Sequence, residues 1–332
     1  MKGLKILAIV LVIALLAVGF MACNDEVVAE GEYTIVSPDG APALAIASFI
    51  DRADASASLV IKPSISATIA QDALKNDFAI LPANAAVKLY NAGNEIKMVA
   101  TITNGNMFIV SKENDESFEL NHLVGKVLYT IGQGSIPSIM LLATLQANNI
   151  AYEESETPVE GKVAIQYCLD GQALIGKVKT ATTQVYGNLA EPAVSTMVSK
   201  GLGYKVASLQ ELWKTASGSE VAGYPQAVLI AKKSICDEKP EVVDAVLNII
   251  KNNETVIVEE YASAIDKVKT ICEGTSLDAK TMTAQSVANC NIKVYRASTN
   301  IDYIYAGLTA ARQVAPNLFG GEIPAKGSEF YY

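Results

Sequence analysis

The chain has 332 residues, of which 50% are hydrophobic and 18% are charged, a balance typical of a globular protein rather than a disordered one. This length exceeds what one hydrophobic core usually serves, so two compact lobes are expected. The formal net charge of −9 comes without basic runs, which argues against nucleic acid or anionic lipid as an electrostatic partner.

Residues 1–22 have the pattern of a secretory signal peptide. Lys2 and Lys5 form a charged start to the apolar run LKILAIVLVIALLAVGF, and the small Ala22 stands just before Cys23. A permanent transmembrane helix is the alternative, because the run is nearly long enough to span a bilayer. The segment resembles a bacterial lipoprotein precursor, which implies lipidation of Cys23 after cleavage. The acidic residues 23–31 are expected to form a tether behind that anchor.

The strand candidates, in chain order, carry β-branched or aromatic residues and are bounded by turn residues. They are YTIVS (33–37), SLVIK (58–62), DFAIL (77–81), IKMVATIT (96–103), MFIVS (107–111), KVLYTIG (126–132) and QAVLIAKK (226–233). The helix candidates between and after them are 43–53, 65–75, 136–149, 240–262, 276–290 and 300–316. This alternation predicts an α/β fold with mostly parallel sheets, helices on both faces and a helix-rich C-terminal third.

Two pairs of segments are similar within the chain. LPANAAVKLYNAG (81–93) and LAEPAVSTMVSKG (189–201) span the same length and end on glycine, a residue that stops helices. DGAPALAIASF (39–49) and QGSIPSIMLLATL (133–145) each combine a glycine turn, an early proline and an apolar helix. The two pairs predict two lobes with one plan, each offering strand ends, tight turns and helix starts.

The remaining cysteines are Cys168, Cys236, Cys272 and Cys290, and none has the spacing of a zinc site. A disulfide between Cys272 and Cys290 and a set of unpaired thiols both remain open. His122 is the sole histidine and is expected at the surface near a helix end. The sequence therefore predicts no histidine-based catalytic triad, no metal and no cofactor.

In serial order, the segments YTIVSPDGAPALAIASFI, NDFAILPANAAVKLYNAG, LVGKVLYTIGQGSIPS, LAEPAV, GYPQAVLIAKKSI and the tail GGEIP…FYY resemble one family. That family is the substrate-binding lipoproteins of ABC importers, in the cluster for nitrate, sulfonate, bicarbonate and thiamine-pyrimidine uptake. The resemblance implies a type II periplasmic-binding-protein fold with ligand between two lobes. Residues 32–104 and 226–332 would form lobe 1, and residues 105–225 would form lobe 2.

Ligands of open α/β sheets sit beyond the carboxyl ends of strands, where helix N-termini offer free N–H groups. Four loops match that position. The resemblance also implies two interlobe crossings, near 103–107 and 224–226, whose residues can touch ligand in both the open and the closed state. The ligand-binding candidates are Asp39, Gly40, Ala41, Pro42, Asn84, Asn104, Asn106, Gln133, Gly134, Ser135, Ser138, Tyr186, Glu191, Tyr224 and Gln226.

Several of these residues also have a structural interpretation. Asp39 is favoured as a helix cap, whereas capping and ligand contact are equally expected for Asn84. For Glu191, ligand contact and the role of a first-turn glutamate favoured by the helix dipole are equally expected. Asp77 is expected to brace the start of its strand, and the sole Trp213 is expected to pack in a helix.

These observations predict a membrane-anchored solute-binding protein of an ABC importer. The protein itself would make and break no covalent bond. Its partners would be a small-molecule ligand and the permease and ATPase subunits, and it is expected to be an exported, lipid-anchored monomer. A neutral or zwitterionic organic ligand is preferred, because the candidate loops contain no Lys or Arg. The alternatives are a dehydratase-like or pyrimidine-synthase-like enzyme on the same fold, and a surface lipoprotein with an adhesive or antigenic role.

Overall fold

The computed structural model describes residues 29–50, 58–221 and 223–332. The predicted signal peptide at 1–22, Cys23 and most of the predicted tether at 23–31 lie outside the described residues. Within the described ranges, every helix is too short or too polar to cross a bilayer.

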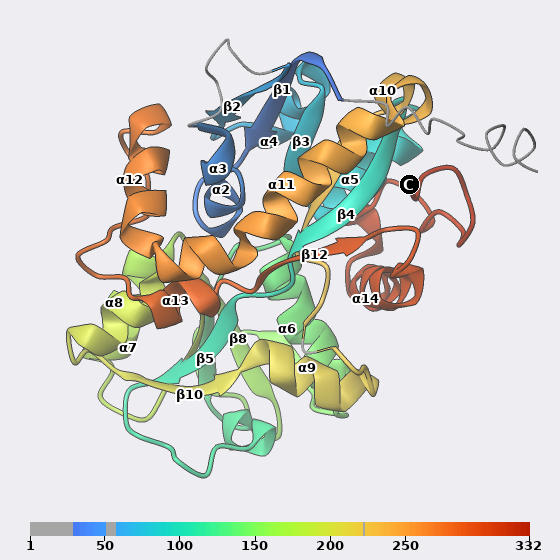
Figure 1. The fold of residues 1–332 in the computed structure, drawn as a ribbon. Coiled ribbons are helices and arrows are strands. Elements are labelled where there is room, and N and C mark those ends of the chain that lie inside the picture. Colours follow the sequence, from blue (N-terminus) through green and yellow to red (C-terminus); the bar gives the residue numbers. More distant parts are fainter. Residues whose placement is uncertain (1–28, 51–57, 222) are drawn as a thin grey trace, which may run out of the picture.

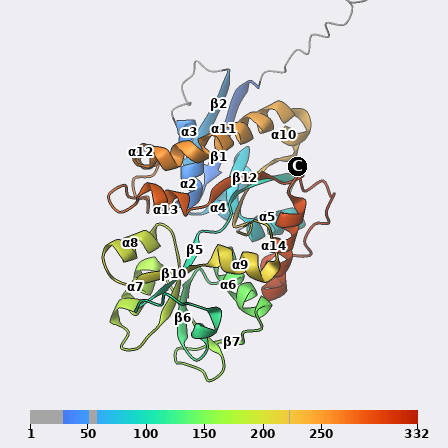
Figure 2. The same cartoon turned by 60° about the horizontal axis from the view of Figure 1, so that its bottom comes forward.

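Two six-stranded sheets form the centres of two lobes, which lie one above the other in Figures 1 and 2. The first sheet has the order β12 (Ile292–Arg296), β4 (Ile96–Thr103), β11 (Ala227–Lys232), β3 (Phe78–Pro82), β1 (Gly31–Ser37) and β2 (Leu59–Ile65). The second has the order β10 (Tyr204–Ser208), β5 (Met107–Ser111), β9 (Tyr186–Ala190), β6 (Val127–Ile131), β8 (Val163–Cys168) and β7 (Tyr152–Glu154). The predicted two-lobe α/β fold class is confirmed.

The sheets are mixed rather than mostly parallel. Five strand pairings among the described residues are parallel, and five are antiparallel. β5 and β11 enter their sheets directly after the chain has crossed from the other lobe. Each is therefore antiparallel to both of its neighbours: β5 to β9 and β10, and β11 to β3 and β4. The sequence alternation alone did not reveal this reversal.

The two lobes share one plan. The strand order β4-β11-β3-β1-β2 of the first sheet matches β10-β5-β9-β6-β8 of the second, with the same relative directions. The segments that are similar in sequence occupy equivalent places. One pair covers β3 with α5 (Ala83–Asn91) and β9 with α8 (Ala193–Ser199). The other lies directly after β1 and contains α2 (Ala41–Ala45), or directly after β6 and contains most of α6 (Ile136–Ala147).

The remaining helices cover the sheets and fill the C-terminal part of the chain (Figure 1). They are α3 (Ala47–Ile50), α4 (Ile69–Asp72), α7 (Gly171–Thr180), α9 (Leu209–Ser217), α10 (Lys233–Glu238), α11 (Pro240–Glu259), α12 (Tyr261–Ile271), α13 (Ala284–Ala288) and α14 (Ile301–Val314). Three short 3-10 helices are η1 (Ala73–Lys75), η2 (Leu120–Leu123) and η3 (Pro316–Leu318).

The long helix α11 crosses one face of the first sheet (Figure 1). Pro240 occupies its first turn, where a missing N–H costs nothing. Val242, Val246 and Ile250 recur every four residues and are fully buried. Burying each such side chain contributes about 1.5–3 kcal/mol, so this face alone holds the helix on the sheet.

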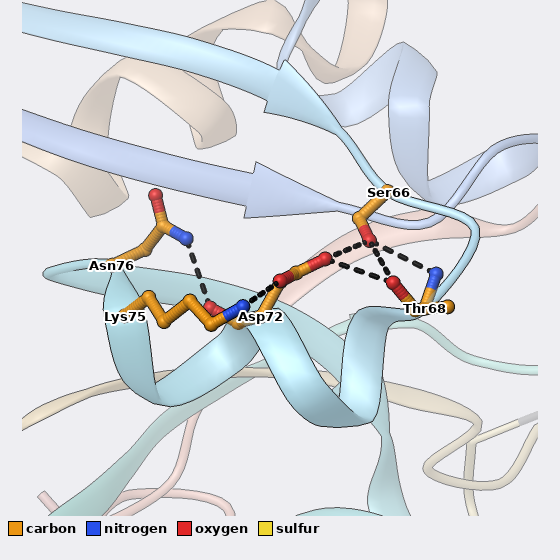
Figure 3. Close-up of polar contacts among 5 residues, drawn as sticks. All are labelled: Ser66, Thr68, Asp72, Lys75 and Asn76. Atoms are coloured by element: carbon orange, nitrogen blue, oxygen red, sulfur yellow. Dashed lines mark hydrogen bonds and ion pairs between the residues drawn. The ribbon is translucent and has the colours of Figure 1, made fainter.

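The helix predicted at 65–75 is shorter than expected. β2 continues through Ile65, and helix begins only at Ile69. The reason lies in local side-chain bonds, which Figure 3 shows: Ser66 and Thr68 donate their hydroxyl protons to Asp72, and Lys75 pairs with the same carboxylate. Such bonds compete with helical pairing. The Lys75 hydrogen bond, followed by those from Ser66 and Thr68, lowers the pKa of Asp72 to about 2.

Other predicted helices also differ in extent. The stretch at 43–53 forms α2 and α3 up to Ile50, beyond which it leaves the described residues. The stretch at 240–262 is divided between α11 and α12 at Glu260. Of residues 276–290, only α13 is helical, and Thr283 starts it with a capping box.

The lobes share a continuous apolar core on one side. α14 of the C-terminal part packs against α6 of the second lobe (Figure 2). The same cluster of buried side chains includes Leu81 below the first sheet, Leu128 in the second, Ile139 in α6 and Leu308 in α14. Trp213 of α9, which is 7% exposed, belongs to this cluster, so its predicted packing role is confirmed.

The four cysteines within the described residues are unpaired. Cys272 and Cys290 are both free, as are Cys168 and Cys236, so the possible disulfide is not formed. Complete burial raises the pKa of Cys290 far above its ordinary range, and the nearby Glu191 adds to the effect. His122 lies in η2 and pairs with Asp115, which agrees with the expected helix-end position.

Asp77 braces the start of β3, as predicted. Its Oδ2 accepts hydrogen bonds from the backbone N–H and the hydroxyl of Thr34 in β1, at 2.9 and 3.0 Å. Its Oδ1 accepts from Lys232 Nζ at the end of β11, at 2.9 Å. The carboxylate therefore joins three neighbouring strands at one edge of the sheet.

Replacing Asp77 by asparagine is expected to destabilise the protein by about 1–2 kcal/mol at pH 7, because charge-assisted bonds to Thr34 and Lys232 are lost. Burial raises the pKa of Asp77, but the bonds from Lys232 and Thr34 outweigh it, so the pKa is lowered. A lowered folded-state pKa means that stability is present above the unfolded-state value and is lost as pH falls through the folded-state value.

Urea unfolding of wild type and Asp77→Asn at several pH values measures this effect. The difference should shrink as pH is lowered below about 4. Asp266→Asn, which removes an exposed carboxylate paired with Lys269, is the matched control and should change stability by less than about 0.5 kcal/mol. A difference that is independent of pH would contradict the charge-based role.

Candidate functional site

A cavity of about 600 Å³ lies between the two lobes. Both lobes contribute to its lining, at the carboxyl ends of β1, β3, β6, β8 and β9 and at the helix starts that follow these strands. The lining residues are Pro38, Asp39, Gly40, Ala41, Pro42, Pro82, Asn106, Ile131, Ser135, Pro137, Asp170, Gly171, Gln172, Ala190, Glu191, Pro192, Ala193, Thr196, Gln226, Ala227 and Ser276. The volume suits a small organic molecule.

The base of the cavity is a polar network that joins both interlobe crossings. Asn106 lies on the first crossing and Gln226 on the second. Gln226 Nε2 donates to Asn106 Oδ1 at 2.9 Å, and Asn106 N donates back to Gln226 Oε1 at 3.3 Å. Asn106 Nδ2 also donates to the backbone carbonyl of Glu191 at 3.1 Å. These predicted site residues therefore come together, and each holds the others in place.

Glu191 is 3% exposed, and its carboxylate acts in two directions. Oε2 accepts from Ser195 N at 3.0 Å and Oε1 from the Ser195 hydroxyl at 3.0 Å, which satisfies the start of α8. Oε1 also accepts from Asn289 Nδ2 at 3.1 Å, and Asn289 follows α13 in the other lobe. Glu191 precedes Pro192, the N-cap of α8, so it is not a first-turn residue, although its carboxylate accepts an N–H of that turn. The same carboxylate links the two lobes and lines the cavity.

Asp39 lines the cavity but does not cap the helix that follows it. The N-cap of α2 is Gly40, without a side-chain bond, so the preferred capping role is wrong. Instead, Asp39 Oδ1 accepts from the Thr275 hydroxyl at 2.5 Å and Oδ2 from Ser276 N at 2.7 Å. Burial raises the pKa of Asp39, but these hydrogen bonds outweigh it and lower the pKa, which keeps the group ionised.

The sequence reasoning missed the loop between β8 and α7. Asp170 is the N-cap of α7, and its Oδ1 accepts from Ala173 N at 2.8 Å. Gly171 and Gln172 follow it along the cavity wall. A signal was present, because the strand VAIQYC (163–168) ends shortly before an Asp-Gly pair, which is typical of a helix start.

Ser276 and Thr196 also line the cavity without having been predicted. Ser276 comes from the loop between α12 and α13, and Thr196 comes from the first turns of α8. Neither position carries a local motif in the sequence. Ser276 is brought to the cavity by its bond to Asp39, which is more than two hundred residues away in the chain.

Four predicted residues near the cavity lie outside its lining. Asn84 is buried in α5, where Pro82 is the N-cap, so it neither caps nor faces the cavity, and its Oδ1 has no partner among the described residues. Ser138 donates to Gly132 O at 2.7 Å, inside the turn that starts α6. Gln133 is exposed, and a Cβ on Gly134 would lie 3.4 Å from Leu318, so this turn faces η3 rather than the cavity.

Three more predicted residues lie elsewhere. Asn104 is fully buried and bonds within the first lobe. Its side chain donates to Lys293 O at 2.8 Å and accepts from Tyr303 Oη at 3.0 Å. Tyr186 begins β9, at the end opposite the cavity, and donates to Asp115 at 2.9 Å. Tyr224 is fully buried in the core. Proximity to a crossing was therefore not sufficient to place a side chain in the cavity.

Replacing Tyr224 by phenylalanine is expected to stabilise the protein by about 1 kcal/mol. The Tyr224 hydroxyl is buried and has no hydrogen-bond partner among the described residues, a state that costs about 1–3 kcal/mol. Tyr186→Phe is the matched control, because it removes a hydroxyl that donates to Asp115, and it should destabilise by about 1 kcal/mol. Thermal unfolding of both variants measures these changes in stability, and a loss of stability in Tyr224→Phe would contradict the prediction.

The ionisable side chains of the lining are all acidic. Asp39, Asp170 and Glu191 supply carboxylates, and no Lys, Arg or His belongs to the described lining. In the described ranges, no three His, Cys, Asp or Glu side chains gather closely enough to hold a metal ion. The cavity is therefore equipped to bind a polar organic molecule through carboxylates, amides and hydroxyls.

Comparison with known proteins agrees with this architecture. The model of the family described as NMT1/THI5 like matches residues 61–264, which is more than half of the chain. A search of curated proteins finds no match. A solved ABC transporter from Parabacteroides distasonis has a TM-score of 0.70 at 20% identity, covering 90% of this chain and 98% of that one.

Two further solved structures have the same fold. The periplasmic aliphatic sulphonate binding protein SsuA from Escherichia coli has a TM-score of 0.63 at 12% identity, covering 89% of this chain and 94% of that one. The ligand-binding component of an ABC-type import system from Staphylococcus aureus, solved with zinc bound, has a TM-score of 0.61 at 13% identity, covering 91% and 97%. Because the family model matches more than half of the chain, the chain belongs to the NMT1/THI5-like family.

Proposed function

We propose that this protein is the solute-binding component of an ABC-type importer. It captures a small organic molecule in the cavity between its lobes and presents the closed form to a permease. The observation that carries the proposal is the cavity itself, which both lobes line with strand ends and helix starts. The proposal is supported by the structurally similar proteins, which are an ABC transporter, a ligand-binding component of an ABC-type import system and a periplasmic sulphonate-binding protein.

The architecture also suits ligand-driven closure. Only the segments at residues 104–106 and the stretch before β11 connect the two sheets, and both border the cavity through Asn106 and Gln226. A ligand that touches both lobes binds the closed form better than the open form. By that differential affinity it shifts the population toward the closed form.

Binding of a solute without turnover tests the proposal. Purified protein is screened by thermal shift against amines, amides, pyrimidines, carboxylates and sulfonates, and each hit is titrated by calorimetry. A ligand at 100 times its Kd should stabilise the protein by about 2.7 kcal/mol. Chromatography of the incubated ligand should return it unchanged. Conversion of the ligand to a product would support the enzymatic alternative, and failure of every solute to bind would support an adhesive surface role.

Export and anchoring are part of the proposal. The chain is expected outside the cytoplasm, held to the membrane by acyl chains on Cys23, because two or more chains anchor firmly where one is marginal. Cys23→Ala expressed with its leader should leave the membrane fraction, whereas Cys168→Ala should stay in it. Retention of both variants in the membrane would instead favour an uncleaved transmembrane segment.

A further inference from the structure

Three carboxylates from three different loops surround the cavity. Asp39 follows β1 in the first lobe, whereas Asp170 follows β8 and Glu191 follows β9 in the second. They do not form a metal-binding cluster among the described residues. Their charge is therefore spread over the walls of the cavity instead of being focused on one ion.

Each of these carboxylates already accepts a backbone N–H. Asp170 accepts from Ala173 and Glu191 from Ser195, within the first turns of α7 and α8. Asp39 accepts from Ser276 N in the facing loop. Backbone N–H groups at helix starts are the donors that an anionic ligand uses when no cation is present. Here the resident carboxylates occupy part of that donor set.

The remaining positive potential does not balance the carboxylates. The N-terminus of a helix carries about half an elementary charge, and α5, α6 and α7 are the longer helices that start at the cavity. Together they offset about half of the three negative charges. The described lining contains no Lys, Arg or His to offset the rest. The interior of the cavity is therefore negative at neutral pH.

The apolar part of the lining is aliphatic. Its apolar surface comes from Pro38, Pro42, Pro82, Pro137, Pro192, Ile131 and several alanines, and no aromatic side chain belongs to the described lining. A ring stacked between aromatic side chains, the usual mode for planar heterocycles, has no platform here. An aliphatic body of moderate size fits these walls.

We propose that the ligand presents an ammonium-type cationic group to this acidic cavity, has an aliphatic body and carries no net negative charge. This inference rests on the proposed solute-binding function and narrows it. Asp170 is the first candidate partner of the cation, because its Oδ2 is not used in capping α7 and the residue lies at the cavity wall. Gln172, Thr196 and Ser276 supply uncharged polar contacts around it.

A matched set of probes tests the charge preference. Hexylamine, hexanamide, hexanoate and hexanesulfonate share one apolar chain and differ in the charge of the head group. They are titrated by calorimetry into the purified protein, beside a wider panel of diamines, amino acids and alkanesulfonates. The amines are expected to bind at least about tenfold more tightly than the matching anions.

The Asp170→Asn variant tests the assigned partner. Asparagine caps helices as well as aspartate does, so α7 should be preserved while one negative charge is removed. Affinity for hexylamine is expected to fall about tenfold, with hexanamide unchanged. Asp302→Asn is the control, because Asp302 is 88% exposed, pairs with Lys326 and lies outside the lining. Equal hexylamine affinity in both variants would overturn the role of Asp170.

The outcomes separate this inference from the proposed function. Tighter binding of hexanesulfonate or hexanoate than of hexylamine overturns the cationic ligand and leaves a solute-binding protein in place. Failure of every compound of every charge class to bind overturns the solute-binding function, and the ligand class with it. Preferential binding of amines supports both.

Discussion

Gly223→Ala is expected to destabilise the protein by about 3 kcal/mol. Gly223 lies on the second interlobe crossing at φ +149°, a backbone conformation that residues with a side chain rarely adopt. A Cβ there would lie 2.3 Å from the backbone oxygen of Asn104, which cannot move away freely. That oxygen accepts hydrogen bonds from Tyr224 N and Asn291 Nδ2.

The clash matters because the two crossings are paired. Tyr224 N donates to Asn104 O at 3.2 Å, and Gln226 N donates to Thr103 O at 3.0 Å. A methyl group on Gly223 separates these segments and weakens both bonds. The effect reaches the cavity through Gln226, which positions Asn106 at its base.

Urea unfolding followed by circular dichroism and by the fluorescence of Trp213 measures the loss. Trp213 reports the second lobe, so coincidence of the two transitions also shows whether the lobes unfold together. Gly176→Ala is the control: this glycine lies inside α7 with no atom within 4 Å of the added Cβ, and it should stabilise by about 0.5–1 kcal/mol. A loss below about 1 kcal/mol for Gly223→Ala would mean that the crossings shift easily.

Glu191→Ala is the second substitution with a large expected effect, about 3 kcal/mol of lost stability together with a more open molecule. Glu191 is almost fully buried and accepts from Ser195 N, from the Ser195 hydroxyl and from Asn289 Nδ2. Removing it leaves these partly buried donors without this acceptor, and each hydrogen bond to a charged group contributes about 1.5–3 kcal/mol.

Its two roles can be separated with its partners. Asn289→Ala removes the bond between the lobes, together with an exposed bond from Gln285 beside α13. The ligand-free molecule should therefore populate the open form more and show a larger radius of gyration by small-angle X-ray scattering. Ser195→Ala removes a hydroxyl that bonds the same carboxylate within one lobe, and it should leave the radius unchanged.

A double-mutant cycle completes the test. If Glu191 and Asn289 hold the lobes together, the stabilities of Glu191→Gln, Asn289→Ala and the double variant should show a coupling of about 1 kcal/mol. Additive effects, or an equal change of radius in Ser195→Ala, would show that this pair does not control opening.

Local patterns in the sequence were sufficient for the framework. The strand ends before Pro38, Pro82 and Ser135, and the repeated segments at 81–93 and 189–201, predicted two lobes with equivalent strand-helix units. The same patterns located Asp39 to Pro42, Ser135 and Glu191 at the cavity, because the carboxyl ends of parallel strands meet at one edge of a sheet. Asn106 and Gln226 were located by the interlobe crossings that the family resemblance implies. Asp77 was also identified correctly, since it starts a buried strand beside polar partners.

Other residues depended on contacts that no local pattern contains. Asn104 and Asn106 looked equivalent, but Gly105 between them adopts φ +89° and turns the chain. One side chain consequently faces Lys293 and Tyr303, and the other faces Gln226 and the cavity. The sequence by itself determined the lobes, the strand ends and the acidic character of the chain. Only the tertiary structure decided which side chains reach the cavity, because the bonds that orient them, such as Asp39 to Ser276 and Glu191 to Asn289, join segments far apart in the chain.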